Sequence, residues 1–301
     1  MASKVERDEH DIVAKPLRHP GRWVAATLIT VILGTFLWSL LTVDSIDHDM
    51  IAKYLFSPLI LNGAILTVIL TASSMAIATV LATLLAVMKL SENRLLRILA
   101  TGYIEFFRGT PLLLQIVFWG YLGIIYPTLT LGIPFTNIVF VHGQTSALIP
   151  SLAAGIIALA LNEAAYSAEI VRAGILSVDG GQMEAASSLG MRGGYTLRRI
   201  ILPQAMRVII PPMGNEFISM LKNTALLEVV AVLELYTQAT MISAQNLAQV
   251  ELLVVAGFWY LVMTTILSIP QRQLEKKYGR GFNVTTARAR MFGLGKKKVS
   301  A

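Results

Sequence analysis

Long runs without a charged residue dominate this sequence. Four of them lack Asp, Glu, Lys and Arg altogether: residues 23–43, 54–88, 109–162 and 252–271. A helix needs about 20 consecutive apolar residues to cross the ~30 Å hydrocarbon core of a bilayer. Charged residues make up only 14% of the chain, whereas about a quarter is usual in soluble domains. The sequence therefore predicts an all-α protein that crosses a membrane several times.

The basic residues predict how the chain is threaded through that membrane. Of the 25 Lys and Arg residues, 22 fall in four segments: 1–22, 89–97, 172–207 and 271–301. Cytoplasmic segments carry such an excess of positive charge, and the loops between them are almost free of it. Both termini are therefore expected in the cytoplasm, which requires an even number of crossings. Six spans satisfy this requirement: 23–43, 61–88, 103–125, 148–171, 213–237 and 251–270.

The net charge of +7 follows from this distribution and does not point to nucleic acid. The run Lys296-Lys297-Lys298 near the end of the chain is interpreted as a contact with anionic membrane lipid. The chain has no cysteine, which excludes disulfides, zinc-thiolate sites and cysteine nucleophiles.

The cytoplasmic segment between the fourth and fifth spans carries the most informative pattern. Asp179 is a residue type that caps a helix N-terminus, Glu184-Ala185-Ala186 favours helix, and Gly190 is a natural helix stop. The pattern predicts a helix of two or three turns that runs parallel to the membrane. Such a helix, held between two spans, can dock into a groove of a partner and transmit force.

The same segment resembles the integral-membrane subunits of ABC importers. That family carries Glu-Ala-Ala, then Gly after three residues, then Ile after nine more, then one residue and Leu-Pro. This chain has Glu184-Ala185-Ala186, Gly190, Ile200 and Leu202-Pro203 at the same spacings. The resemblance implies that the residues that couple the chain to an ATPase are Glu184, Ala185, Ala186, Gly190, Leu202 and Pro203.

Other stretches are similar to the permeases for polar amino acids, of the histidine, glutamine and arginine kind. These are residues 107–115, 162–170, 202–205 and 222–226. The likeness covers about residues 60–290, and Ala225 stands where the subfamily often has Ser. The resemblance implies a translocation path for polar amino acids. A permease for another small polar solute, such as an opine or cystine, and a channel or secondary transporter that works without an ATPase remain as alternatives.

The resemblance also implies a domain layout and a set of partners. We expect a cytoplasmic segment at 1–22, an extra membrane helix at 23–43, a five-helix permease domain at 58–272 with a coupling loop at 177–203, and a basic tail at 273–301. The expected partners are ABC ATPase subunits, an extracytoplasmic amino-acid-binding protein, and a second permease copy in a homo- or heterodimer. ATP and Mg²⁺ would be bound by the ATPase. The chain itself would lie in the inner membrane of a prokaryote and cross it several times.

Polar residues inside the expected spans are candidates for the substrate path, because ionisable groups in a membrane usually face a protein interior or a water-filled cavity. Asn162, Tyr166 and Glu169 share one helix face, and Asn215, Ser219 and Lys222 repeat that spacing. The other candidates are Arg108, Thr110, Gln115, Glu163, Asn223 and Thr224. The alternative is structural: these residues pair with one another, and Arg108 pairs with Glu105 one turn earlier.

Several signals of other functions are missing from the sequence. There is no phosphate-binding loop of the Gly-x4-Gly-Lys-Ser/Thr type, so the chain is not expected to hydrolyse ATP. No catalytic or metal-binding motif is found. In loop 126–147, Pro127, Gly132 and Pro134 interrupt helix, which predicts a loop or an interfacial segment.

Overall fold

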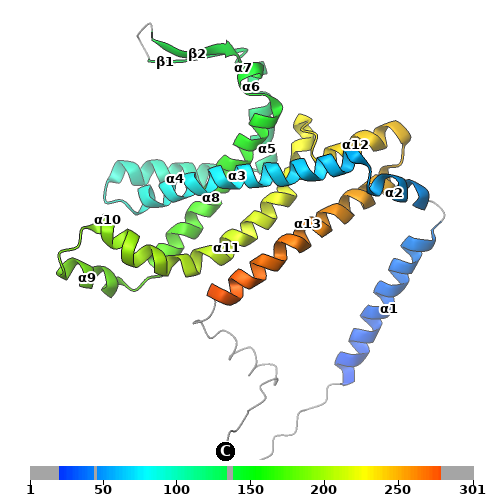
Figure 1. Ribbon diagram of the computed structural model, residues 1–301, viewed down its shortest axis with the longest axis horizontal. Helices are drawn as coiled ribbons and strands as arrows, with labels where there is room; N and C mark the ends of the chain where they lie inside the picture. The colour runs from blue at the N-terminus through cyan, green and yellow to red at the C-terminus, as the bar shows by residue number, and fades with distance from the viewer. Residues whose placement is uncertain (1–19, 44–45, 134–137, 279–301) are drawn as a thin grey trace, which may run out of the picture. The chain divides into compact units, whose positions relative to one another are not determined.

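The computed structural model describes residues 20–43, 46–133 and 138–278 (Figure 1). The chain divides into two compact units, residues 1–46 with 282–301 and residues 47–281, and each is described by itself. In the first unit, helix α1 (Pro20–Thr42) covers the apolar stretch expected to be an extra membrane helix. Most of the expected N-terminal segment, most of the basic tail and Pro134 lie outside the described residues.

The second unit is built from helices and one β-hairpin. Its elements are α2 (His48–Leu55), α3 (Pro58–Leu90), α4 (Arg94–Gly109), α5 (Leu112–Gly120), α6 (Leu122–Ile125), β1 (Thr128–Gly132), β2 (Val139–Gln144), α7 (Thr145–Leu148), α8 (Ser151–Leu176), α9 (Gly180–Ser188), α10 (Gly193–Thr196), the π-helix η1 (Leu197–Ile201), α11 (Leu202–Asn223), the 3₁₀-helix η2 (Thr224–Val230), α12 (Leu235–Asn246) and α13 (Gln249–Tyr278). The all-α class is thereby confirmed, with one small sheet added.

Three helices in the described part of the chain, α3, α8 and α13, are long and apolar enough to cross a membrane. A fourth candidate is the bent pair formed by residues 193–230 and α12, which meet at 45°. The expected number of six spans is therefore not confirmed.

Two of the expected spans differ from the helices observed. The expected span 103–125 is divided among α4, α5 and α6, because the chain breaks between α4 and α5, where Pro111 has no N–H to continue the hydrogen-bond ladder. The expected span 213–237 lies within the bent pair: α11 already begins at Leu202, and the chain turns after η2, where Ala231 adopts a left-handed φ of 54°, before α12 begins.

Small side chains let the longest helices approach one another closely. Ala78 and Ala82 of α3 are fully buried in one cluster with Ala164 and Ala168 of α8. At Gly174 of α8, a Cβ atom would lie 2.3 Å from a side-chain carbon of α11. Such interfaces are typical of membrane helices, where close van der Waals packing replaces the hydrophobic effect.

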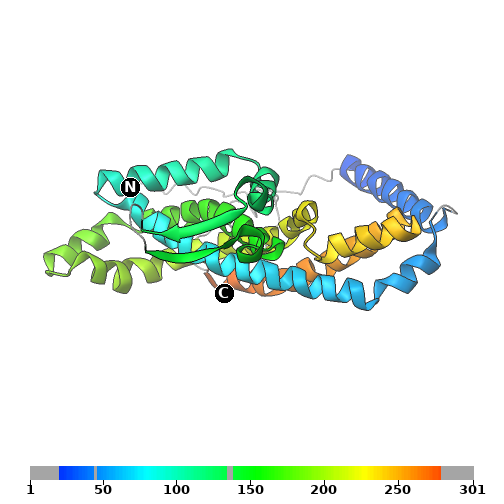
Figure 2. The ribbon, with the colours of Figure 1, turned by 90° about the horizontal axis from the view of Figure 1, so that it is seen from above.

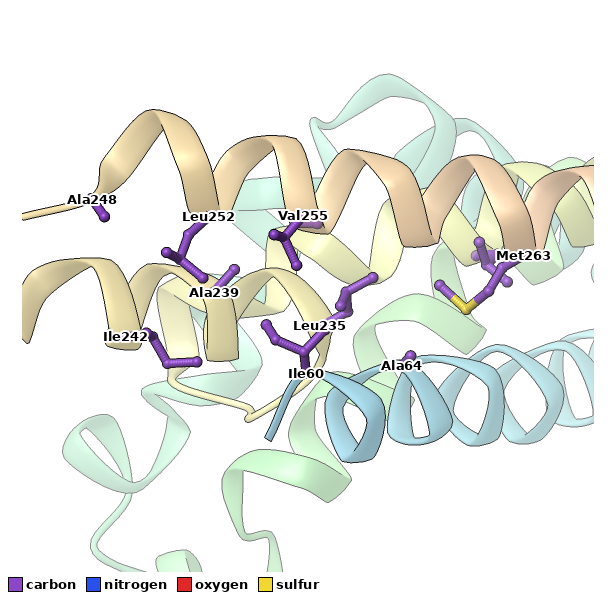
Figure 3. Close-up of a cluster of buried hydrophobic side chains, with 11 residues drawn as sticks. Ile60, Ala64, Leu235, Ala239, Ile242, Ala248, Leu252, Val255 and Met263 are labelled. Carbon is purple, nitrogen blue, oxygen red and sulfur yellow. The ribbon is translucent and has the colours of Figure 1, made fainter. Parts of the chain in front are cut away.

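A second cluster holds α12 between α3 and α13 (Figure 3). Ile60 of α3, Leu235 and Ile242 of α12, and Leu252 and Val255 of α13 are all buried in it. The bent segment that follows η2 is thus anchored against both long helices.

The loop expected at 126–147 contains a two-stranded antiparallel sheet, which was not predicted from the sequence. Figures 1 and 2 show β1 and β2 side by side at the end of the α5–α6 segment. A bulge between Leu131 and Gly132 shifts the register. At Gly132 a Cβ would lie 2.3 Å from the carbonyl oxygen of Ile138, so the strands require glycine there.

Candidate functional site

Helix α9 has the ends that the sequence predicts. Asp179 Oδ1 accepts a hydrogen bond from the N–H of Gly181 at 2.7 Å and caps the helix. At the other end Gly190 has φ +73°, and its N–H donates to the carbonyl of Ser187 at 2.9 Å. The N–H of Met191 reaches the carbonyl of Ala186 at 3.1 Å, which completes a Schellman motif. The predicted short helix with a glycine stop is confirmed.

The outer surface of α9 is open. Ala186 is buried, whereas Glu184 and Ala185 are exposed. Two large apolar side chains, Met183 and Leu189, are 42% and 80% exposed. Neither was among the predicted coupling residues, although an apolar residue beside a helix-stop glycine is a recognisable signal. The arrangement presents a capped helix with apolar projections, suited to a groove on a partner.

The segment after α9 returns the chain to the bundle. Leu202 and Pro203 are the first two residues of α11, and both are exposed. Pro203 has no N–H, and the π-helix η1 ends two residues before it, at Ile201, with the N–H of Leu202 bonded to the carbonyl of Leu197. Gln204 Nε2 donates to the carbonyl of Ile200 at 3.1 Å and lies 3.5 Å from Gln182 Oε1 of α9. Helix α9 is thereby connected to the start of α11.

A polar network closes the break between α4 and α5. Gln115 Nε2 donates to the carbonyl of Phe107 at 3.0 Å, to the carbonyl of Thr110 at 3.1 Å, and to Thr110 Oγ1 at 2.8 Å. Asn162 Nδ2 of α8 donates to Gln115 Oε1 at 3.2 Å and to the Phe107 carbonyl at 3.1 Å. Three of the predicted path residues therefore come together, and they satisfy backbone groups that the break exposes.

The remaining α8 residues have separate partners. Glu169 accepts hydrogen bonds from Lys89 Nζ of α3 at 2.6 Å and from Arg172 Nε and Nη2 at 3.0 and 2.9 Å. Arg108 lies over the ring of Tyr166, 5.3 Å from its centroid. Within the described residues Arg108 forms no ion pair with Glu105, so that expected pairing is wrong.

Two carboxyl groups, those of Glu163 and Glu216, lie on α8 and α11, two helices that pack against each other. Glu163 is 4% exposed and accepts a hydrogen bond from Ser167 Oγ at 2.7 Å. Glu216, half-buried on α11, is close enough for its charge to act on Glu163. Glu216 was not among the predicted path residues, although a carboxylate in an apolar helix is a signal that the sequence offers.

The polar residues of α11 are more open than those of α8. Asn215 and Lys222 are exposed, while Ser219 and Asn223 are half-buried. Thr224 is fully buried and donates to the carbonyl of Leu221 at 2.8 Å. Among the described residues no hydrogen bond joins the predicted α11 stripe to the predicted α8 stripe.

A buried carboxylate that was not predicted as a site residue lies at the start of α12. Glu234 is fully buried and caps α12 through the N–H groups of Tyr236 and Thr237 at 3.1 and 2.7 Å. It also accepts from Tyr260 of α13 at 2.7 Å and from Thr67 of α3 at 3.4 Å. Glu is not among the residue types that commonly cap a helix N-terminus, so nothing in the sequence signalled this role.

Three cavities accompany these groups. One of about 550 Å³ lies between α3, α8, α11 and α13 and is lined almost entirely by apolar side chains. One of about 350 Å³ lies between α12 and α13 and includes Thr240, Ser243 and Gln249. The third, about 270 Å³, lies at the α4–α5 break beside Gln115 and is otherwise mostly aromatic.

Comparison with known proteins identifies a family over the part of the chain that contains α9. The model of the family described as binding-protein-dependent transport system inner membrane component matches residues 78–280, which include α9 and the bundle around it. The fold is that of an importer permease, and the chain belongs to this family.

Relatives and solved structures agree with that placement. The arginine transport system permease protein ArgU of Corynebacterium glutamicum is 47% identical over 282 residues, covering 92% of this chain and 86% of that protein. The L-cystine transport system permease protein TcyB of Bacillus subtilis is 37% identical, covering 78% and 93%. A crystal structure of an amino acid ABC transporter with histidines matches with a TM-score of 0.64 at 36% identity, covering 77% of this chain and 99% of that one. The chain is thus a multi-pass inner-membrane transport subunit.

Proposed function

We propose that this chain is the permease subunit of an ATP-driven importer for polar amino acids and that α9 is its contact with the ATPase. The observation that carries the proposal is the combination of a matched permease family with a capped helix whose Met183 and Leu189 project outward. ATP and Mg²⁺ would be bound by two partner ATPase subunits, and a soluble binding protein would deliver the substrate on the other side.

The path itself would be lined by the predicted polar residues whose side chains remain open. Arg108, Tyr166, Asn215 and Lys222 are exposed in a single chain, and a second permease copy would cover them. Thr110, Gln115, Asn162 and Glu169 already have partners within the chain. These four would hold the helices that form the path.

Basic amino acids are the first substrates to test, because the relative with 47% identity transports arginine by name. The glutamine and cystine permeases among the other relatives are 33–37% identical. Because of these similarities, amide amino acids and cystine should also be tested as substrates. Both termini would lie in the cytoplasm, on the side of α9.

The test is uptake of labelled amino acids in cells that lack the gene and carry either the wild-type chain or Glu184→Lys. We expect ATP-dependent uptake of one amino-acid class with the wild type and none with Glu184→Lys, while both proteins insert equally. Uptake that survives ATP depletion would contradict the importer mechanism. If the wild-type chain restores uptake of none of the tested amino acids, the proposed substrate class is contradicted.

A further inference from the structure

The cavity of about 550 Å³ between α3, α8, α11 and α13 is unsuited to a polar ligand. Its polar side chains already have hydrogen-bond partners. Thr79 and Thr83 donate their hydroxyl groups to carbonyl groups of α3 itself, at 2.7 and 2.8 Å, and Gln271 Nε2 donates to the carbonyl of Pro211 at 2.7 Å. An amino acid would lose its hydration there without gaining partners for its charged groups. The cavity therefore calls for an apolar occupant.

One end of the cavity is open. Leu202, the first residue of α11, and Leu274, near the end of α13, both line it, and they are 36% and 37% exposed. Helices α3, α8 and α13 are long and apolar enough to cross a membrane. Lipid acyl chains fill the core of the bilayer around such helices, so an acyl chain can reach the cavity from the side.

Two basic residues lie at this open end. Helices α11 and α13 run antiparallel (Figures 1 and 2), and Gly214 lies against Gln271. Seven residues are about two helical turns. Arg207, seven residues before Gly214, therefore comes level with Tyr278, seven residues after Gln271. Lys277 lies beside it, with Nζ 5.8 Å from the centre of the Tyr278 ring.

The charges of these two residues are not neutralised within the described part of the chain. Arg207 and Lys277 are exposed, and neither forms an ion pair with a described residue. The neighbouring acid on α13, Glu275, accepts a hydrogen bond from Gln271 at 3.1 Å. An apolar cavity with unpaired cations at its mouth matches an acyl chain that lies below a phosphate group. Basic residues near a membrane surface attract anionic lipid in this way.

Protein occupants match this charge less well. Neither α1 nor the segment 279–301 contains Asp or Glu, so neither can supply acidic side chains to Arg207 and Lys277. In an isologous interface, a second copy would bring the same two basic residues to the same place. Like charges that face each other across an interface are unfavourable.

We propose that this cavity holds an acyl chain of an anionic phospholipid and that Arg207 and Lys277 bind its phosphate. This lipid site goes beyond the proposed function, because the lipid is bound and not transported. The lipid would hold α11 against α13 at the end of α11 that adjoins η1. It would thus stabilise the segment through which α9 is connected to the bundle.

The test is a titration of the full-length permease, purified with its partner subunits, with dioleoylphosphatidylglycerol. Bound lipid is counted by native mass spectrometry. We expect a tightly retained lipid on each permease chain, and the double variant Arg207→Gln/Lys277→Gln should bind it about tenfold more weakly or worse. Arg272→Gln/Lys276→Gln is the matched control and should keep the wild-type affinity. Both control positions are two residues from Leu274, on the opposite face of α13.

The apolar part of the site is tested on the wild-type protein. Dihexanoylphosphatidylglycerol has the same headgroup with short chains, so we expect it to bind more weakly than the dioleoyl lipid. Dioleoylphosphatidylcholine, which has the same chains but no net charge, should also bind more weakly.

Three results would overturn the proposal. Equal affinity of the two double variants would show that no particular basic pair binds the lipid. Equal binding of the short-chain lipid would show that the cavity does not hold a chain. The natural chain has no cysteine, so a disulfide between two copies of Leu274→Cys in membranes would show that protein covers the opening. Lys277→Gln alone replaces the double variant if the latter does not assemble, with the same expected direction.

Discussion

Gly190 carries the most constrained backbone of the α9 segment. Its φ of +73° closes the Schellman motif and directs the chain from α9 toward α10. For a residue with a Cβ, the left-handed region costs about 1–2 kcal/mol. The end of α9 therefore depends on a glycine for conformational reasons, since nothing lies within 4 Å of a Cβ added there.

Gly190→Ala is expected to loosen the end of α9 and to reduce ATP-dependent transport while leaving membrane insertion intact. Gly193→Ala is the matched control, because an added Cβ also meets nothing at Gly193, and the positive φ among the described glycines is confined to Gly190. Uptake rate per inserted protein is the measurement. Equal uptake by the two variants would show that the left-handed turn is not needed for coupling.

At the scale of elements, the contact between α11 and α13 depends on the absence of a side chain. A Cβ at Gly214 of α11 would lie 1.6 Å from Gln271 Oε1 of α13. Gln271 is buried in this position because its Nε2 donates to the carbonyl of Pro211 at 2.7 Å. Helices α11 and α13 thus fit together because Gly214 leaves room for the side-chain amide of Gln271.

Gly214→Ala is expected to lower the thermal unfolding midpoint, with overpacking that costs about 1–3 kcal/mol. Gln271→Ala should remove the clash, so the double variant should be destabilised by less than the sum of the two single changes. Gly257→Ala on α13 is the control, since an added Cβ there contacts nothing within 4 Å. Additive shifts in the unfolding midpoint would contradict the proposed clash.

Helix α12 depends on a single carboxylate for its position. Glu234 accepts bonds from two backbone N–H groups of α12 and from hydroxyl groups of Thr67, Thr237 and Tyr260. It therefore ties the turn after η2 to both α3 and α13. This arrangement explains why a charged residue is tolerated inside an otherwise apolar cluster.

Glu234→Gln is expected to destabilise the detergent-solubilised protein by at least the ~1–2 kcal/mol of a lost cap. The amide keeps one acceptor oxygen and turns an NH₂ group toward donors. Glu228→Gln on η2 is the control, because Glu228 is exposed. Thermal unfolding of the two variants gives the comparison, and an unchanged midpoint for Glu234→Gln would show that the network does not hold α12.

At the scale of the molecule, helix packing in the second unit relies on small residues and a few polar networks. Ion pairs among the described residues are confined to Glu169 and its two partners, Lys89 and Arg172. This cluster joins the C-terminal end of α3 to the C-terminal part of α8, shortly before α9 begins. Movement of α9 would therefore be passed to α3 as well as to α8, which suits a subunit whose spans are expected to rock as a body.

The sequence by itself determined the membrane class, the family resemblance and the ends of α9. Each of these depends on local patterns: charge-free runs, fixed spacings, an acidic cap and a helix-stop glycine. Local patterns are reliable there because the groups that satisfy the backbone are neighbours in the chain, as with Asp179 and Gly181.

Only the tertiary structure decided which polar residues are paired. Gln115 and Asn162 look alike as path candidates in the sequence, yet they meet across 47 positions to close a helix break. Glu234 is a charged residue inside the expected span 213–237, and the structure shows it to be the anchor of α12. The hairpin in loop 126–147 also depends on pairing between separate segments. Such contacts between distant residues are fixed by packing, for which a single sequence gives no local signal.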